Sequence, residues 1–407
     1  MKIALLGYGK EGQAAEKYFK DKFNARADIF QDFTREEIEK QDFSDYDLVL
    51  RSPSVPPLNL PNESSLTRYF FDHCPCPIIG VTATKGKGTT CSFVKSLLDA
   101  MGENVHLVGN IGTPSIEVLD ALTKDDVVVY EMSSFQLWDL KKSPHVAVVG
   151  TIEPDHLNVH NGFDDYTNAK ANICRYQTEN DYTIYYGKNP DSVKIAKNGN
   201  GKKITYPFPI PEEIKNAVHI PGAHNIENAI AAIAAVASFY NLTSEEFIEK
   251  NQENIKKGLS GFKGLPHRLE FVREIGKIKV YDDNFSTNPA STRVAVNAFP
   301  NNDVVIIVGG RDKTDNADLP EIYEVISAPN IKSVILIGES GHELAKKYQD
   351  DRFTVVESLE DAVSSAVKIT ENYDKPIVLM SPSAASFDMF KNVYDRGDKF
   401  KLLINNL

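Results

Sequence analysis

The chain has 407 residues, which is too long for one compact core and predicts two or three domains. Hydrophobic residues make up 42% and charged residues 25%, a balance that excludes a disordered chain. Lys and Arg total 45 against 57 Asp and Glu, and the resulting net charge of −12 argues against a general binder of nucleic acid or anionic membranes. One local basic site for a small phosphorylated ligand remains compatible with this charge.

The cysteine content and the lengths of the apolar runs indicate the cellular compartment of the protein. The four cysteines are too few for a disulfide framework, and Cys74 and Cys76 are separated by one residue with no matching second pair, which argues against a zinc site. The N-terminal sequence has only four successive apolar residues before a glycine, so it predicts neither a secretory signal nor a transit peptide. No apolar run reaches the length of a membrane span. We expect a reduced, cytoplasmic protein.

Short apolar runs alternate with helical patterns along most of the chain. Such alternation predicts βαβ units and mostly parallel sheets, with helices on both faces. We therefore expect an α/β protein of three blocks, at residues 1–73, 74–263 and 264–407. Prolines at 52–57, followed by the stretch at 58–62, suit a connector because proline ends regular structure.

The expected elements follow from these runs in chain order. Strands are predicted at 2–6, 27–30, 46–50, 77–81, 127–130, 146–152, 278–281, 304–308, 334–337 and 376–380. Helices are predicted at 11–22, 89–101, 164–177 and 224–240, and the alanine-rich last one is expected to be buried. The polar segment at 191–200 is predicted to be a surface loop.

The first glycine-rich turn, Gly7-Tyr-Gly-Lys-Glu-Gly12, follows a predicted strand and opens a predicted helix. Glycines allow a tight turn there, and the helix N-terminus offers free N–H groups to an anion. Asp32 lies near the end of the second strand, where an acidic residue would contact the ribose of a nicotinamide cofactor. A nucleotide site, a dehydrogenase site and a tight turn without a ligand all remain open.

A second loop, Gly80-Val-Thr-Ala-Thr-Lys-Gly-Lys-Gly-Thr-Thr90, gives a sharper signal. Successive N–H groups between a strand and a helix can surround phosphate oxygens, and Lys87 can reach the terminal ones. The spacing departs from the common phosphate loop, since five residues separate Gly80 from Gly86 and Gly88 stands where Ser or Thr is usual. We favour a triphosphate site over a flexible, solvated loop.

Polar groups that follow predicted strands are candidates for a metal site. Glu131 ends one strand and His156 follows another, and ligands of parallel sheets gather at these strand ends. Mg²⁺ prefers oxygen ligands together with substrate phosphates. Lys170 lies on the predicted helix at 164–177, and its spacing alone does not distinguish it from a solvated surface lysine.

With these residues, the chain resembles the Mur ligases, ATP-dependent amide-forming enzymes of peptidoglycan precursor synthesis. The similarity is collinear over nearly the whole chain, and within the family it is greatest to the D-glutamate-adding members. The matching segments are 80–90, 109–112, 131–137, 155–156, 222–228, 265–268, 283–292, 309–313 and 381–388, followed by 390–392 and 396–397.

The resemblance implies three domains that bind a uridine nucleotide, ATP and the incoming amino acid. It implies ligation of D-glutamate to UDP-N-acetylmuramoyl-L-alanine by a monomer that uses ATP and Mg²⁺. The implied catalytic residues are Lys87, Glu131, His156 and Lys170, the last being carbamylated in the family. Metal contacts are implied for Thr89, Glu131, His156 and Lys170, with Asn110 helping to organise the ion.

The resemblance also implies binding residues in each block. ATP contacts are implied for Thr84, Lys85, Gly86, Lys87, Gly88, Thr89, Thr90, Asn228, Arg268 and Asp283. Substrate contacts are implied for Gly9, Lys10, Glu11, Ser52, Asn110, Ser133, Ser134, Thr287, Lys313, Ser386 and Phe387.

Several positions depart from the family pattern. Ala83 and Gly88 replace a usual Gly and a usual Ser or Thr, and the loop form is similar to that of folylpolyglutamate synthases. Phe285 stands where the glutamate-adding enzymes usually carry Lys, and Val393 stands where an aromatic residue is common. These two changes bear on amino-acid specificity more than on the type of reaction.

Overall fold

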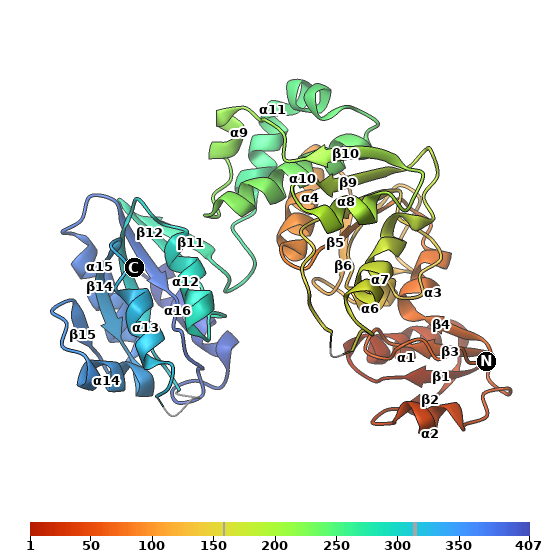
Figure 1. Cartoon of the computed structure of the whole chain (residues 1–407), viewed down its shortest axis with the longest axis horizontal. Coiled ribbons are helices and arrows are strands. Elements are labelled where there is room, and N and C mark those ends of the chain that lie inside the picture. Colours follow the sequence, from red (N-terminus) through yellow and green to blue (C-terminus); the bar gives the residue numbers. More distant parts are fainter. Residues whose placement is uncertain (158, 312–315) are drawn as a thin grey trace. The chain divides into compact units, whose positions relative to one another are not determined.

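The computed structural model describes residues 1–157, 159–311 and 316–407 (Figure 1). It contains two compact units, one formed by residues 1–217 and 226–261 (unit 1) and one by 218–225 and 262–407 (unit 2). Unit 1 holds two β-sheets and unit 2 holds a third. The α/β class expected from the alternating pattern is confirmed, while the boundaries after 73 and 263 stay predictions.

The first sheet has four parallel strands in the order β2-β1-β3-β4. Its strands are β1 (Lys2–Leu6), β2 (Arg26–Phe30), β3 (Leu48–Arg51) and β4 (Glu63–Ser65). The helices of this part are α1 (Lys10–Phe23), α2 (Arg35–Glu39) and α3 (Leu66–His73). Strand β1 is central and apolar along most of its length because both of its faces are covered.

The second sheet has six parallel strands in the order β10-β9-β8-β5-β7-β6. They are β5 (Ile78–Thr82), β6 (Val105–Gly109), β7 (Val127–Glu131), β8 (Val146–Val149), β9 (Tyr182–Tyr186) and β10 (Lys202–Tyr206). The helices are α4 (Lys87–Met101), α5 (Ser115–Val118), α6 (Ser134–Leu137), α7 (Phe163–Arg175), α8 (Pro190–Ala196), α9 (Glu212–Asn216), α10 (Ala223–Phe239) and α11 (Ser244–Gly261). Strand β5 is buried at every position and leads directly into the second glycine loop.

The third sheet has the order β11-β12-β16-β13-β14-β15, with β11 antiparallel to β12 and the rest parallel. The strands are β11 (Glu270–Ile275), β12 (Ile278–Asp282), β13 (Asp303–Val308), β14 (Ile331–Leu336), β15 (Phe353–Val355) and β16 (Pro376–Met380). The helices are α12 (Pro289–Asn297), α13 (Leu319–Ile326), α14 (Gly338–Lys347), α15 (Leu359–Thr370) and α16 (Val393–Asn405). Successive residues of β13 enter different apolar clusters, which include α12–α14 on one face and α15 and α16 on the other.

A buried arginine helps to join the first two sheets into one unit. Arg51, at the end of β3, pairs with Glu63 at 2.6 Å and with Asp139 at 2.6 Å, and it donates to the Val55 carbonyl at 2.7 Å. One apolar cluster also contains residues of both sheets. Because a buried guanidinium needs its ionic partners, this pairing holds the region after α6 against β3 and β4.

The expectation of a loop at 191–200 is wrong. Helix α8 begins there because Asn189 accepts a hydrogen bond from the Ser192 N–H at 2.8 Å and Pro190 occupies the first turn. Ser192, Ile195 and Ala196 share the buried face. Within the described ranges, no single helix is long and apolar enough to cross a membrane, although the bent pair of α10 and α11 satisfies length and composition together.

Candidate active site

The glycine loop joins the end of β5 to the start of α4. Gly86 has a φ of +83°, and a Cβ atom there would come within 2.9 Å of the Asn228 Oδ1 atom, so both backbone and space require glycine. Helix α4 begins at Lys87, and its first N–H groups have no partners within the helix. The Lys87 amine folds back and donates to the carbonyls of Ala83 at 3.0 Å and Thr84 at 3.2 Å. The loop therefore holds its lysine beside a helix end whose N–H groups are available to an anion.

Thr84 fixes the loop against the segment that follows β8. Its hydroxyl donates to the Glu153 carbonyl at 3.0 Å, accepts from the Glu153 N–H at 2.9 Å, and lies 2.9 Å from the Tyr166 hydroxyl. The Thr84 N–H also donates to the Thr151 carbonyl at 2.7 Å. These bonds fix the loop against residues 151–153 and helix α7.

Lys170 is buried, with 1% of its surface exposed, so the interpretation as a solvated surface lysine is wrong. Its amine donates to Thr82 Oγ1 at 3.1 Å and to the Ala83 carbonyl at 2.9 Å, and it lies 4.8 Å from the centre of the Tyr166 ring. Burial lowers the Lys170 pKa well below its ordinary value, and repulsion from Lys87 adds a smaller effect in the same direction. The amine of this buried lysine therefore lies at the end of β5.

Carboxylates of neighbouring segments face this amine. Glu131 ends β7, is 5% exposed, and pairs in register with Val81 of β5. The negative charges of Asp155 and Glu131 act on Lys170 in the direction opposite to burial, which shows that both carboxylates are near. The Asn110 N–H donates to the Glu131 carbonyl at 3.3 Å. Oxygen donors therefore gather at the ends of β5, β6 and β7.

This oxygen-rich donor set fits a hard cation such as Mg²⁺. Glu131 is the buried carboxylate, and Thr89 lies in the first turn of α4 with its residue only partly exposed. His156 contributes less to the set. It is about half exposed, and its Nε2 atom lies 3.5 Å from a carboxylate oxygen of Asp155.

The two predicted serines lie at the start of α6. Ser133 caps this helix by accepting from the Gln136 N–H at 3.2 Å, and the Gln136 side chain accepts in return from the Ser133 N–H at 2.9 Å. Ser134 is buried, and its hydroxyl lies 2.9 Å from Nε2 of His160. His160 is in turn bonded to Asp165 at 3.1 Å, and burial lowers its pKa.

A pocket of about 410 Å³ lies beside the first glycine turn. Its lining includes Gly9 and Asp32 but not the other predicted contacts in this region, Lys10, Glu11 and Ser52. The full lining comprises Gly7, Tyr8, Gly9, Gln31, Asp32, Phe33, Arg35, Ser54, Val55, Pro56 and Leu58. Lys10 is exposed. The Ser52 hydroxyl lies 3.0 Å from that of Ser54, which is itself in the lining.

Glu11 turns towards the second sheet instead of the pocket. One carboxylate oxygen accepts from the Gln136 side chain at 3.1 Å. Burial raises the Glu11 pKa to about 7, and the hydrogen bond from Gln136 only partly opposes this effect.

In unit 2, Asp283 follows strand β12 and is 6% exposed. It accepts from the Leu269 N–H at 3.1 Å and from the Ser381 hydroxyl at 2.8 Å, and it also bonds Ser286. Burial raises its pKa to about 6. The carboxylate is therefore held between the segments that carry β12 and β16.

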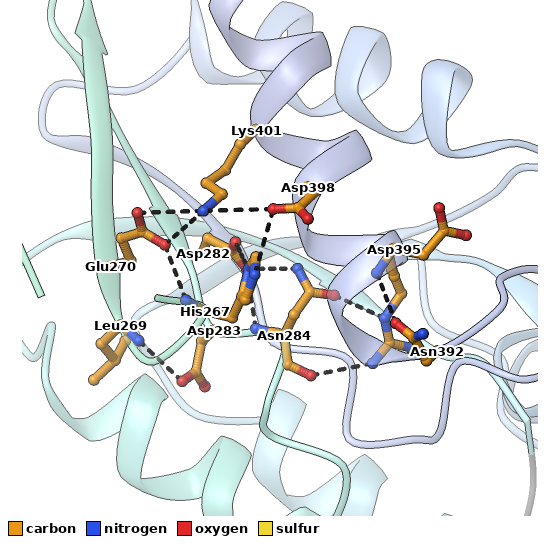
Figure 2. Close-up of polar contacts among 11 residues, drawn as sticks. His267, Leu269, Glu270, Asp282, Asp283, Asn284, Asn392, Asp395, Asp398 and Lys401 are labelled. Atoms are coloured by element: carbon orange, nitrogen blue, oxygen red, sulfur yellow. Dashed lines mark hydrogen bonds and ion pairs between the residues drawn. The ribbon is translucent and has the colours of Figure 1, made fainter. Parts of the chain in front are cut away.

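A polar network surrounds the neighbouring residues of β12 (Figure 2). His267 Nδ1 lies 2.7 Å from Asp282 Oδ2, while Lys401 contacts Glu270 at 3.1 Å. His267, Glu270 and Asp282 together have metal-ligand spacing, but their atoms already bond one another or Lys401. Buried Arg396 donates to Asn284 Oδ1 at 2.7 Å and to the Ala384 and Ala385 carbonyls, which fixes the loop that precedes Ser386.

The other predicted residues of unit 2 differ in exposure. Arg268 is exposed, and its guanidinium carbon lies 5.1 Å from the centre of the Phe285 ring. Ser386 is buried, Thr287 is partly buried, and Phe387 is 67% exposed. Lys313 lies outside the described residues.

Sequence reasoning did not select Asp155, His160 and Tyr166 as site residues. Tyr166 stands four residues before Lys170, so both lie on one face of α7, and a search along that face would have found it. His160 carries no such signal, since only the fold brings it to Ser134.

Comparisons with known proteins show which family the chain resembles. Residues 81–215 match the family model of the Mur ligase middle domain, and 267–384 match that of the Mur ligase, glutamate ligase domain. The UDP-N-acetylmuramoylalanine–D-glutamate ligase of Clostridium tetani is 31% identical over 401 residues, covering 89% of this chain and 84% of that protein. The enzyme of the same name from Acetivibrio thermocellus is 32% identical over 403 residues, covering 89% and 83%.

Solved structures show the same fold. The UDP-N-acetylmuramate-alanine ligase of Thermotoga maritima aligns with a TM-score of 0.56 at 17% identity, over 100% of this chain and 99% of that chain. The folylpolyglutamate synthase of Mycobacterium tuberculosis aligns with a TM-score of 0.54 at 16% identity, over 83% and 95%. With two matching domains and relatives above 30% identity over most of its length, the chain belongs to the Mur ligase family.

Proposed function

We propose that the protein is an ATP-dependent ligase that joins D-glutamate to UDP-N-acetylmuramoyl-L-alanine in the cytoplasm, acting as a monomer. The relatives that cover 89% of the chain carry that name, which supports this substrate pair. The observation that carries the chemistry is the glycine loop, where the Lys87 amine and the start of α4 lie beside the buried amine of Lys170 and the carboxylate of Glu131.

The proposed reaction activates a carboxylate that is otherwise unreactive towards an amine. A carboxylate resists attack by an amine because of its negative charge, so the γ-phosphoryl group of ATP is first transferred to the carboxylate of the uridine substrate, giving an acyl phosphate. The amine of D-glutamate then attacks the acyl carbon, and the tetrahedral intermediate expels phosphate. Lys87 and the N–H groups of Gly88 and Thr89 offset the repulsion between the two anions in the first step.

Glu131 and Thr89 would hold Mg²⁺, with His156 and Asn110 at its margin. When bound, the ion neutralises phosphate charge and orients the triphosphate. Lys170 would supply an anionic oxygen after carbamylation, because burial lowers its pKa and so favours the unprotonated amine that reacts with carbon dioxide.

Further contacts are proposed residue by residue. Asn228 lies against Gly86 and would contact the adenine, Asp283 the ribose and Arg268 the phosphates. The pocket beside Gly9 and Arg35 would take the uridine nucleotide. The amino acid would be bound by Thr287, Lys313, Ser386 and Phe387. Which amino acid is accepted would also depend on Phe285 and Val393. Ser133 and Ser134 would support the muramoyl substrate.

The test is ADP release in the presence of ATP, Mg²⁺ and UDP-N-acetylmuramoyl-L-alanine with a panel of amino acids. We expect D-glutamate to give the highest kcat/KM. Preference for another amino acid would leave the ligase chemistry in place but reject the substrate assignment. ATP binding without substrate-dependent ADP release would instead indicate a non-catalytic homologue.

The dehydrogenase alternative can be tested separately. Gly7, Gly9 and Asp32 do line one pocket, as a nicotinamide cofactor would require. We expect UDP-sugars to raise the melting temperature and NAD to leave it unchanged, and stabilisation by NAD alone would reverse the assignment of this pocket.

A further inference from the structure

The sequence Cys74-Pro75-Cys76 forms the connection between α3 and β5, at the passage from the first sheet to the second. Cys74 ends α3, and its N–H donates to the Phe70 carbonyl at 2.8 Å. Its φ of −67° and ψ of 122° are the extended values that a following proline favours. The connection is thus ordered by the helix end on one side and by the proline on the other.

The two sulfur atoms face one another across this short connection. Cys74 Sγ lies 3.6 Å from Cys76 Sγ and also 3.6 Å from the Cys76 carbonyl oxygen. Residues two apart have Cα atoms separated by at most about 7 Å, and a disulfide accepts Cα separations of about 4.4–6.8 Å. Bond formation therefore needs side-chain rotation and a small local adjustment, without movement of either sheet.

The two thiols differ in access and acidity. Cys74 is partly exposed, whereas Cys76 is 7% exposed and belongs to the apolar core of unit 1. The hydrogen bond between the two thiols lowers the pKa of Cys74 and raises that of Cys76. Because Cys74 is the more exposed of the two, it is the thiol that a dissolved disulfide reaches first.

The remaining thiols provide an internal comparison. Cys91 and Cys174 are both fully buried. Burial raises the pKa of each, in the case of Cys174 to about 11. Both should therefore react slowly with any reagent dissolved in water.

We propose that Cys74 and Cys76 form a reversible oxidation site that reacts with low-molecular-weight disulfides. The Cys74 thiolate attacks a disulfide RSSR, forming a mixed disulfide and releasing one thiolate, RS⁻. Cys76 then loses its proton and attacks the Cys74 sulfur, which closes the intramolecular bond and releases the second RS⁻. The protein loses two electrons and two protons, and RSSR is reduced to two thiols.

The product should be easily reversed by thiols. A ring closed between residues two apart removes little chain entropy from the unfolded state, and its geometry is constrained by proline. Strained disulfides near the surface have higher reduction potentials than structural ones, so an excess of reduced thiol restores the pair.

The test uses the folded full-length chain and oxidised glutathione, followed by acid quenching, alkylation of remaining thiols and tryptic mass mapping. Cleavage after Arg68 and Lys85 places both cysteines on the peptide 69–85, apart from Cys91 and Cys174. We expect this peptide to lose two hydrogens and both alkylation sites, and to regain them with reduced glutathione. Persistent alkylation of both sites, or oxidation of Cys91 or Cys174 first, would overturn the proposal.

Two matched variants separate the steps. Cys76→Ser should accumulate a stable glutathione adduct on Cys74, because no second thiol releases it. Cys74→Ser should leave Cys76 alkylatable after the same exposure to oxidant. If Cys76→Ser forms no adduct, or if the wild-type protein retains the adduct without closing the bond, the proposed order of attack is wrong. The wild-type mapping decides the proposal even where a variant folds poorly.

Discussion

The Lys170 amine of helix α7 donates a hydrogen bond to Thr82 Oγ1 at 3.1 Å, although 88 positions separate the two residues in the chain. A second bond, to the Ala83 carbonyl at 2.9 Å, fixes the same amine where the glycine loop begins. The pair therefore couples the placement of α7 to the loop that is proposed to bind ATP.

Replacement of Lys170 tests whether this amine is more than a structural link. We expect Lys170→Ala to lower kcat by roughly 100-fold or more, as loss of one preorganised charge contact does. If Lys170 is carbamylated as proposed, removal of carbon dioxide should also reduce wild-type ADP release, and bicarbonate should restore it. A wild-type rate indifferent to bicarbonate would argue against carbamylation.

Lys87→Ala tests the phosphate loop itself. The variant should stay folded, since among the described residues the Lys87 amine donates to carbonyls of its own loop. We expect turnover to fall about 100–1,000-fold, equivalent to roughly 2.7–4 kcal/mol of transition-state stabilisation. Circular dichroism serves as the folding control, and near-wild-type ligation by the folded variant would show that the loop assignment is wrong.

Glu11 should make stability depend on pH in a predictable direction. Its pKa is about 7 in the folded chain against an ordinary 4.5, so the folded state binds the proton more tightly than the unfolded state. The free energy of unfolding therefore falls as pH rises from about 4.5 to 7, by at most about 3 kcal/mol.

Glu11→Gln removes this titration while keeping a polar side chain beside Gln136. Relative to the wild type, the variant should gain stability between pH 5 and 8, measured by urea unfolding in matched buffers. Glu39→Gln, at an exposed position, controls for the general effect of charge. A constant difference between Glu11→Gln and the wild type across this range would contradict the burial argument.

Phe285 should position the guanidinium of Arg268 through the 5.1 Å ring contact. Exposed cation–π contacts contribute about 0.5–1 kcal/mol, so Phe285→Ala should raise the KM for ATP by roughly two- to fivefold with a smaller effect on kcat. Phe285→Trp should retain the wild-type KM because it keeps an aromatic face. Equal KM values for the Ala and Trp variants would mean that the ring does not act through Arg268.

The fold class and the location of most central strands follow from the amino-acid pattern. β16 spans 376–380 and β1 spans 2–6, as their apolar runs predict, because a strand covered on both faces must be apolar at successive positions. Edge strand β10, with the sequence Lys-Lys-Ile-Thr-Tyr, was missed since its exposed positions are polar. Helix α8 is not evident from its apolar pattern, because its sequence is largely polar and its start is marked only by the Asn189 cap and Pro190.

Motif order along the chain also sufficed to identify the family, which the comparisons confirm. Tertiary structure alone decided that Lys170 is buried against Thr82, that Glu11 faces Gln136, and that Arg51 pairs with Asp139. Local sequence patterns indicate whether a position is buried, because the free energy of transfer from water is a property of each side chain by itself. Local patterns do not indicate which distant group pairs with a buried charge, since that partner is determined only when the sheets and helices pack.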